Sequence, residues 1–413
     1  MDSNSYADDF EPADFSLSNP RIIPDPYPAY EILRQRDPIH NSRMYGGSWV
    51  FFAYEDVVTM LTDDRLTNNR SNLPLLALAP EQREEFADLV PVLSNWVAFF
   101  DGDAHLLRRQ HMNRICNLFS KESLTPIIDR AVDELLSTWG ERADLIADFS
   151  RPLPAMVITQ LLGAPVTDHE LLARWSDDIA YLFGASALTV DDLRRGRSAV
   201  QQFAGYLGEL VSHSVRFGHD TMLAKLAVEE SGGFHFDEAA ACAQGMLLMF
   251  AGLEPTRYLI GNAVWALQHH PRQRQRLQSD PALLSSAVEE FLRYDTPVQF
   301  VGRAAARSFT YRGNRIEAGQ AVLLHVGSAN RDRAVFPDPD ELDLARSSNR
   351  HVSFGRGPHV CIGALLVRLQ AKAALRALLE RFPGLRVADD VEPVWNSNLG
   401  FHGFTSLTVT TGR

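Results

Sequence analysis

The chain is poor in cysteine, in long apolar runs and in positive charge, and each shortage excludes a class of protein. Three of its 413 residues are cysteines, which is typical of a reducing compartment and excludes a disulfide scaffold. No apolar run reaches the ~18 residues of a membrane span, and the acidic start lacks the regions of a signal peptide. The 40 Lys and Arg residues against 52 Asp and Glu give a net charge of -12, which argues against binding to nucleic acid or an anionic membrane. We expect a soluble, cytoplasmic monomer.

What is present is a mainly helical pattern around one unusually apolar segment. Asp237 can cap the start of this segment and Pro271 follows its end, which predicts a helix of ~33 residues and about 50 Å. Because it is apolar on most faces, we expect it to be buried. Short strand patterns lie between about 297 and 350 and in the C-terminal tail, and helix returns after Cys361. The prediction is a mainly α fold with a smaller β region, made of a flexible arm over 1–20 and a single domain over 21–413.

The stretch "HVSFGRGPHVCIGALLVRLQ", residues 351–370, places Cys361 in a loop with three glycines at the start of a helix. Free N–H groups and the helix dipole there favour a thiolate, which is a soft metal ligand. Gly355 and Gly357 permit unusual turn angles, and Gly363 lets the helix approach a large flat partner. No second Cys or His stands at zinc-site spacing. A single thiolate suits a metal held by a macrocycle, such as haem; a merely buried or reactive cysteine is the alternative.

The loop resembles the haem-binding loop of the cytochrome P-450 superfamily. The matching pattern is Phe354-Gly355-x-Gly357-x-His359-x-Cys361-x-Gly363, followed by Ala364, Leu366 and Arg368. The resemblance runs from about Pro24 to Leu407 and is closest in kind to the soluble bacterial, actinobacterial type. It implies the cytochrome P-450 fold with a long central helix over the haem, haem b as cofactor, and Cys361 as the axial ligand of the iron.

Further motifs agree with this resemblance in the family's order. It implies that His105 and Arg109 in "HLLRR", His359 in the loop and Arg303 in "FVGRAAA" hold the haem propionates. Without the resemblance, the first two would be an ordinary i,i+4 surface pair and Arg303 a residue at a strand end. The implied haem contacts are completed by Phe354, Gly355, Gly363 and Ala251.

Glu290 and Arg293 in "EEFLRYDTP" resemble the family's structural ion pair. Such i,i+3 pairs occur on many helices, so the pattern is weak by itself. The resemblance implies that Arg346 or His351 completes a network around them, and we expect this network to be structural.

The predicted long helix departs from the family's sequence signature at one position, and this departure is the most informative one in the chain. The family's signature is Ala/Gly-Gly-x-Asp/Glu-Thr, and this chain has Ala251-Gly252-Leu253-Glu254-Pro255-Thr256. The resemblance implies that Gly252 leaves room for oxygen and that Glu254 is the family's acid. Pro255 stands where an alcohol helps to deliver protons, and proline has no donor. Because it also clashes with the carbonyl of Ala251, we predict a break or kink.

Three functional hypotheses follow from Pro255. The first is oxygenation (hydroxylation or epoxidation) with an altered proton relay, in which ordered water, a substrate hydroxyl or Thr256 replaces the alcohol. The second is non-standard haem chemistry: peroxide-driven oxidation, oxidative coupling, nitration or nitrogen transfer. The third is a non-catalytic haem sensor. For Glu254, a solvated acid on a helix face is the alternative interpretation.

The substrate and the electron donors are implied only in outline. We expect an apolar or aromatic intermediate of secondary metabolism, free or bound to a carrier protein, and electrons from a ferredoxin and a ferredoxin reductase, because no flavin or iron–sulfur motif is present. Arg356 and Arg368 are candidate docking residues. The tail has His402 where the family often has Arg before Gly403, and it resembles the branch that nitrates aromatic amino acids. The aromatic residues expected to line the pocket, with plain core packing as the alternative, are Trp96, Phe99, Phe100, Tyr181, Phe183, Phe300, Phe401 and Phe404.

Overall fold

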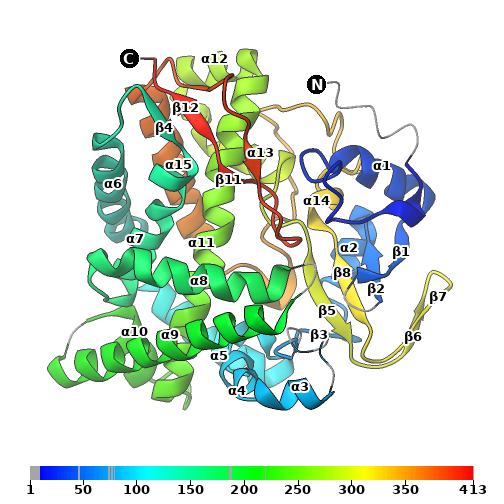
Figure 1. Ribbon diagram of the computed structural model, residues 1–413, viewed down its shortest axis with the longest axis vertical. Helices are drawn as coiled ribbons and strands as arrows, with labels where there is room; N and C mark the ends of the chain where they lie inside the picture. Colours follow the sequence, from blue (N-terminus) through cyan, green and yellow to red (C-terminus); the bar gives the residue numbers. More distant parts are fainter. Residues whose placement is uncertain are drawn as a thin grey trace.

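The structure is a computed structural model that describes residues 10–44, 47–72, 75, 78, 80–185, 188–218 and 220–412. A larger helical part lies beside a smaller part that contains the main sheet and helices α1, α2 and α14 (Figure 1). This confirms the prediction of a mainly α fold with a smaller β region. The helices are α1 Tyr27–Arg36, α2 Tyr54–Met60, α3 Pro80–Glu85, α4 Leu89–Ser94, α5 Gly102–Asn117, α6 Lys121–Ser137, α7 Pro152–Leu162, α8 His169–Gly184, α9 Val190–Phe217, α10 Met222–Val228, α11 Glu238–His269, α12 Pro271–Ser279, α13 Leu284–Tyr294, α14 Val326–Ala329 and α15 Ala364–Arg381.

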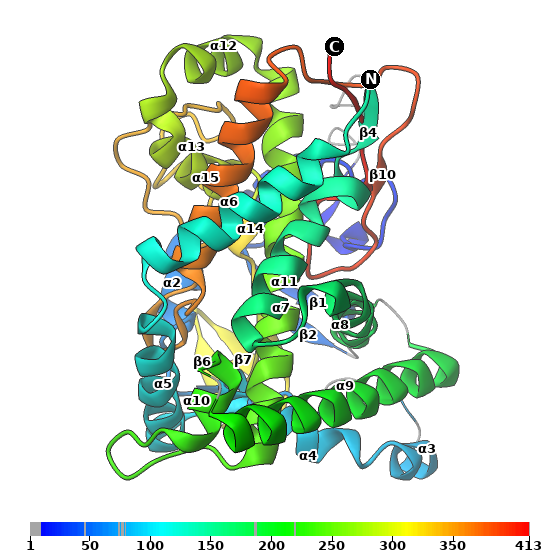
Figure 2. The same ribbon diagram turned by 90° about the vertical axis from the view of Figure 1, so that its left-hand side faces the viewer.

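Helix α11 is the central rod of the helical part, with α6, α7, α8, α9 and α15 arranged around it (Figure 2). It has 32 residues, and the side chain of Asp237 caps its start by accepting a hydrogen bond from the Ala240 N–H at 2.7 Å. The next helix begins at Pro271. The predicted length, boundaries and burial of this helix are therefore confirmed.

The predicted break at Pro255 is wrong, because α11 stays helical through this residue; the kink stays a prediction. Proline removes one i→i−4 hydrogen bond from the ladder, but the turns on either side are packed against α7 and α8. Since tertiary packing supplies most of a helix's stability, the other bonds of a 32-residue helix hold the geometry.

The main sheet joins segments from both ends of the chain. Its strands are ordered β1-β2-β8-β5-β3, with β2 and β8 parallel and the other neighbours antiparallel. In this sheet, β5 is placed so that Arg303 pairs with Val322 of β8. The strands of this and the smaller sheets are β1 Ile39–Ser42, β2 Ser48–Phe51, β3 Leu66–Thr67, β4 Arg142–Asp144, β5 Val301–Ala305, β6 Phe309–Tyr311, β7 Asn314–Ile316, β8 Ala321–Leu324, β9 Arg386–Val387, β10 Val394–Trp395, β11 Phe404–Ser406 and β12 Thr408–Thr410.

The predicted N-terminal arm is packed where the structure describes it. Residues 1–9 lie outside the described residues, but Phe10, Phe15 and Leu17 are buried. The Phe15 ring lies edge-on to Tyr30 and Phe52, with centroid distances of 6.2 and 5.3 Å. From Phe10 onward, this segment therefore belongs to the core of the smaller part. None of the described helices combines the length and the apolar character needed to cross a bilayer.

A buried ion-pair network fixes the end of α13. Glu290 and Arg293 are both fully buried and 2.8 Å apart, and the Arg346 Nε lies 3.2 Å from both carboxylate oxygens of Glu290. His351 instead contacts the neighbouring Glu289 at 3.1 Å. Of the two residues expected to complete the network, Arg346 does so and His351 does not.

Candidate functional site

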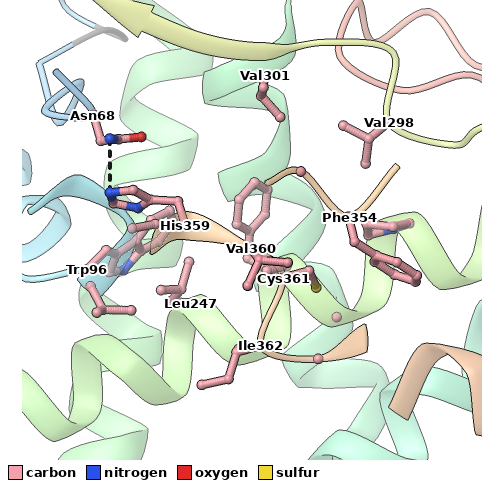
Figure 3. A pocket seen from close by; sticks show the side chains of 18 of the residues that line it. Asn68, Trp96, Leu247, Val298, Val301, Phe354, His359, Val360, Cys361 and Ile362 are labelled. Carbon is pink, nitrogen blue, oxygen red and sulfur yellow. Dashed lines mark hydrogen bonds between the residues drawn. The ribbon is translucent and has the colours of Figure 1, made fainter. Parts of the chain in front are cut away.

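A cavity of about 1050 Å³ lies between α11, β5, α5 and the loop that carries Cys361. Figure 3 shows Cys361 and Phe354 of this loop and Val298 and Val301 near β5 around the same space. Ligand pockets usually measure about 300–1,000 Å³. The volume is therefore large enough for a bulky cofactor together with a second molecule.

The loop holds Cys361 in place through backbone geometry. Gly355 and Gly357 have φ angles of 70° and 76°, in the left-handed region that favours glycine, as the sequence predicted. The Cys361 N–H donates to the Phe354 carbonyl at 2.9 Å. Helix α15 begins just after Gly363, its N-cap. The thiol therefore lies beside a helix N-terminus and faces the cavity.

Opposing effects act on the pKa of the Cys361 thiol. Burial raises the pKa of its thiol, and this effect outweighs the Gly363 N–H, Arg109 and Arg368, which favour the thiolate and lower the pKa. Among the described residues, no group of three His, Cys, Asp or Glu side chains could hold a metal ion. A metal bound to this thiolate would therefore need its remaining ligands from another molecule, which is what a macrocycle supplies.

Four basic side chains surround one end of the cavity: His105, Arg109, Arg303 and His359. The rings of His105 and His359 stack with centroids 3.8 Å apart. Burial and the neighbouring positive groups lower the pKa of His359 to about 3, and burial lowers the pKa of Arg303 to about 10.

Within this basic cluster, Arg303 is the side chain that most needs an anionic partner. It is 7% exposed and donates to the Gly302 carbonyl at 2.8 Å; the Asp101 carboxylate attracts its charge, but no ion pair within 4 Å is formed among the described residues. A buried unpaired charge is costly, so this end of the cavity is built for an anion. The carboxylates of haem meet that requirement, and the donor set therefore fits the group. Arg109 also braces the loop, donating to the Val360 carbonyl at 2.6 Å.

The α11 signature divides between two faces of the helix. Ala251, Gly252 and Pro255 line the cavity, whereas Thr256 does not. The Thr256 hydroxyl donates to the Gly252 carbonyl at 2.8 Å and its side chain is buried, so it does not offer a replacement hydroxyl to the cavity. Gly252 has a packing role too, because a Cβ there would lie 2.5 Å from Ile158 Cδ1 of α7.

Glu254 lines a second cavity of about 680 Å³. It is 1% exposed, which overturns the interpretation of a solvated surface acid. Its Oε2 lies 2.8 Å from Arg257 Nη2, and Arg257 Nη1 lies 3.0 Å from Asp177 Oδ1. Burial raises the pKa of Glu254 to about 7, against the opposing effect of Arg257. Ala180 and Asn398 line both cavities.

Most of the predicted aromatic residues lie at the main cavity: Trp96, Phe99, Phe183, Phe300 and Phe401 line it. Trp96 stacks on Phe99 and on Phe250, with centroids 5.6 and 5.4 Å apart. Phe250 was missed by the sequence reasoning, although it directly precedes Ala251 and Gly252 of the α11 signature. Ile158, Arg70 and Asn398 also line the cavity, and no motif marked them.

Three of the aromatic predictions are wrong. Phe100 follows a short 3-10 helix, and its ring packs under the Arg108 guanidinium at 3.9 Å instead of entering the cavity. Tyr181 lines the second cavity. Phe404 is fully buried against Trp395, with ring centroids 4.0 Å apart.

The two candidate docking arginines differ in their surroundings. Arg368 forms two 2.7 Å contacts with Glu289, so its charge is already paired. Arg356 is exposed.

The chain resembles known proteins along almost its whole length. The family model described as "Cytochrome P450" matches residues 197–401. The polyketide biosynthesis cytochrome P450 PksS of Bacillus subtilis is 30% identical over 94% of this chain and 96% of its own, and the vitamin D(3) 25-hydroxylase of Pseudonocardia autotrophica is 34% identical over 94% of each. The cytochrome P450 monooxygenase PikC of Streptomyces venezuelae is 34% identical over 94% of this chain and 92% of its own. The structure of P450BioI with an acyl carrier protein that bears hexadec-9Z-enoic acid has a TM-score of 0.85 and 31% identity, and the match covers 94% of this chain and 99% of that one.

Proposed function

Because this chain belongs to the cytochrome P450 family, whose members are haem-thiolate monooxygenases, we propose that Cys361 is the ligand of the haem iron and that the enzyme oxygenates an apolar or aromatic natural-product intermediate. The observation that carries this proposal is the single cavity that joins Cys361, the buried basic cluster and an aromatic wall. We also propose that electrons come from a ferredoxin and its reductase.

The residues of the cavity have separate roles in holding the cofactor. Haem supplies the iron at which dioxygen is activated. The proposed ligand is the Cys361 thiolate, and Arg303, Arg109, His105 and His359 bind the two carboxylates. Phe354, Gly355, Gly363 and Ala251, which all line the cavity, bound the space for the ring.

Pro255 shapes the proposed proton relay through the backbone. It has no N–H, so the carbonyl of Ala251, four residues before it, lacks its helical donor. Ala251 is exposed to the cavity, so this carbonyl can hold a water where the family has an alcohol. The relay thus uses ordered water, and the hydroxyl of Thr256 stays with Gly252.

Glu254 is the proposed entry point for protons. Its pKa of about 7 suits a group that takes up and releases a proton near neutral pH. The second cavity, with Asp177 and Arg257 on its wall, gives this carboxyl polar surroundings.

The proposed substrate presents a bulky apolar body to the aromatic wall of Trp96, Phe99, Phe183 and Phe250. Relatives are named for polyketide biosynthesis and for mycinamicin IV hydroxylation or epoxidation, which supports a role in secondary metabolism. The complex of P450BioI with an acyl-loaded carrier protein supports testing carrier-bound substrates as well as free ones.

Peroxide-driven oxidation is the second candidate function. The observation in its favour is that α11 presents no side-chain hydroxyl to the cavity: proline occupies the alcohol position and Thr256 is bonded within the helix. An enzyme that receives peroxide needs fewer protons delivered to its oxygen.

The test is a titration of the haem absorption band of the ferric protein with aromatic amino acids, their carrier-bound forms and macrolactones. A shift from low to high spin with one class would identify molecules that enter the main cavity beside the bound haem. Binding of all classes without any such shift, and without product in the presence of ferredoxin and reductase, would overturn the proposed substrate class.

A further inference from the structure

The loop between β10 and β11 carries an aromatic side chain over the main cavity and is fixed at His402. Phe401 lines the cavity and pairs with Val298 beside β5. The His402 N–H donates to the Pro297 carbonyl at 2.8 Å, and the His402 carbonyl accepts from Asn262 Nδ2 of α11 at 3.1 Å. The backbone at His402 therefore determines where Phe401 lies.

Both ring nitrogens of His402 face acceptors. Nδ1 lies 2.8 Å from Asp295 Oδ1, and Nε2 lies 3.0 Å from the carbonyl of Ile23. An ionised carboxylate and a backbone carbonyl can only accept hydrogen bonds, and neutral histidine carries one N–H. Because His402 is only 6% exposed, water does not readily substitute for a missing donor. The geometry is satisfied only by the imidazolium form.

Asp295 is the counter-charge that this arrangement requires. Its Oδ1 also accepts from the Tyr27 hydroxyl at 2.7 Å. His402, Tyr27 and Arg331 hold the pKa of Asp295 below its ordinary value, although burial opposes them. Asp295 is therefore ionised at neutral pH.

We propose that His402 is a positioning residue: as an imidazolium it ties the C-terminal loop to the N-terminal segment and to the end of α13, and so holds Phe401 against the substrate. Loss of its proton releases one of the two anchors and weakens substrate binding. The inference rests on the proposed function only in that the main cavity takes the substrate.

The groups that face His402 come from several elements. Asp295 follows α13, Asp25 and Tyr27 belong to the N-terminal segment and α1, and Arg331 follows α14 with its guanidinium over the Tyr27 ring at 4.0 Å. From β10, Trp395 stacks on the imidazole with centroids 5.0 Å apart. The carboxylates outweigh burial and raise the pKa of His402. The stabilisation is thus fully present below about pH 6.5, the ordinary histidine pKa, and is lost as pH rises through the raised value.

The experiment compares binding of metyrapone, an uncharged pyridine that ligates ferric haem, from about pH 6.5 to about pH 9 in the haem-loaded protein. Wild-type binding should weaken about tenfold at high pH, since a lost hydrogen bond to a charged group is worth at least the ~1.4 kcal/mol of one decade. His402→Arg keeps a permanent charge and should bind with little pH dependence, while His402→Gln should bind weakly throughout. His269→Gln removes an exposed histidine from the end of α11 and is the matched control, which should follow the wild type.

A measurement on the unmodified protein keeps the proposal testable if the variants do not fold. In the diamagnetic ferrous carbonyl form labelled with nitrogen-15, one histidine should show two slowly exchanging ring N–H protons near neutral pH, close to the Trp395 indole. A neutral His402 at pH 6.5, or an unchanged pH dependence in His402→Arg, would overturn the proposal. Neither readout requires turnover. A failure of the proposed reaction would therefore leave the result for His402 valid, and the two failures can be distinguished.

Discussion

Replacing Pro255 by alanine should make the protein more stable and less efficient. The change restores an N–H in the interior of α11 and removes the ring next to the Ala251 carbonyl. Proline in a helix interior costs about 3 kcal/mol relative to alanine. With an unfolding entropy of about 2.1 cal/mol/K per residue over 413 residues, this corresponds to a rise in Tm of about 3 °C.

The loss of efficiency follows from the same hydrogen bond. The new N–H occupies the Ala251 carbonyl, which then no longer holds the proposed relay water. Reduced oxygen should then leave as peroxide, and peroxide released per NADPH should rise several-fold. Pro255→Thr restores the N–H and adds a hydroxyl, so it should gain similar stability while releasing no more peroxide than wild type.

The assay pairs calorimetry of the haem-loaded variants with peroxide and NADPH measurements in the presence of a surrogate ferredoxin and reductase. Substrate affinity, followed by the haem absorption band, should change little in either variant. Unchanged coupling with a much weaker binding constant would refute the reasoning about this position. A Tm that falls in both variants would refute the account of Pro255 within the helix.

Three further predictions test other parts of the site. Cys361→Ser should abolish the thiolate-type spectrum of the ferrous carbonyl complex, and a normal spectrum would contradict the ligand assignment. Native Glu254, with its pKa of about 7, binds more protons than unfolded Glu254 between about pH 4.5 and about pH 7, so its contribution to stability falls as pH rises through this window. Glu254→Gln should remove a pH-dependent loss of up to about 3 kcal/mol in the free energy of unfolding across this window. An equal pH dependence of the free energy of unfolding in wild type and variant, measured with denaturant, would contradict this. A Cβ at Gly184 would lie 1.8 Å from Asn398 Oδ1, so Gly184→Ala should lower the free energy of unfolding by about 1–3 kcal/mol and weaken substrate binding. Urea unfolding and spectral titration measure the two effects. A variant with unchanged stability and binding would mean that the loop around Asn398 moves aside, which would contradict the prediction.

Local sequence signals predicted the parts of this fold that short-range chemistry determines. The cap at Asp237 and the proline at 271 determined the ends of α11, and the glycine spacing predicted the left-handed angles at Gly355 and Gly357. The effect of Pro255 on the helix was not predictable in this way, because packing by α7 and α8 decides whether one lost hydrogen bond breaks the helix.

Side-chain direction and distant pairing were beyond the sequence. Phe99 and Phe100 are neighbours, but only Phe99 lines the cavity, since one step along a turn redirects the side chain. The second cavity beside Glu254 depends on α8 and the C-terminal loop, which are far apart in sequence. The contacts of His402 join residues 107 and 379 positions away, and no local pattern marks them.

The most direct test of the central claim is the isotopic composition of product formed under oxygen-18 gas. The protein would be supplied with ferredoxin, reductase and the compound that shifts its spin state. The account predicts that product gains one oxygen-18 atom and that its yield depends on the reductant. Product that contains no oxygen from the gas, or that forms equally well from peroxide without reductant, would contradict an oxygenase with a water relay at Pro255.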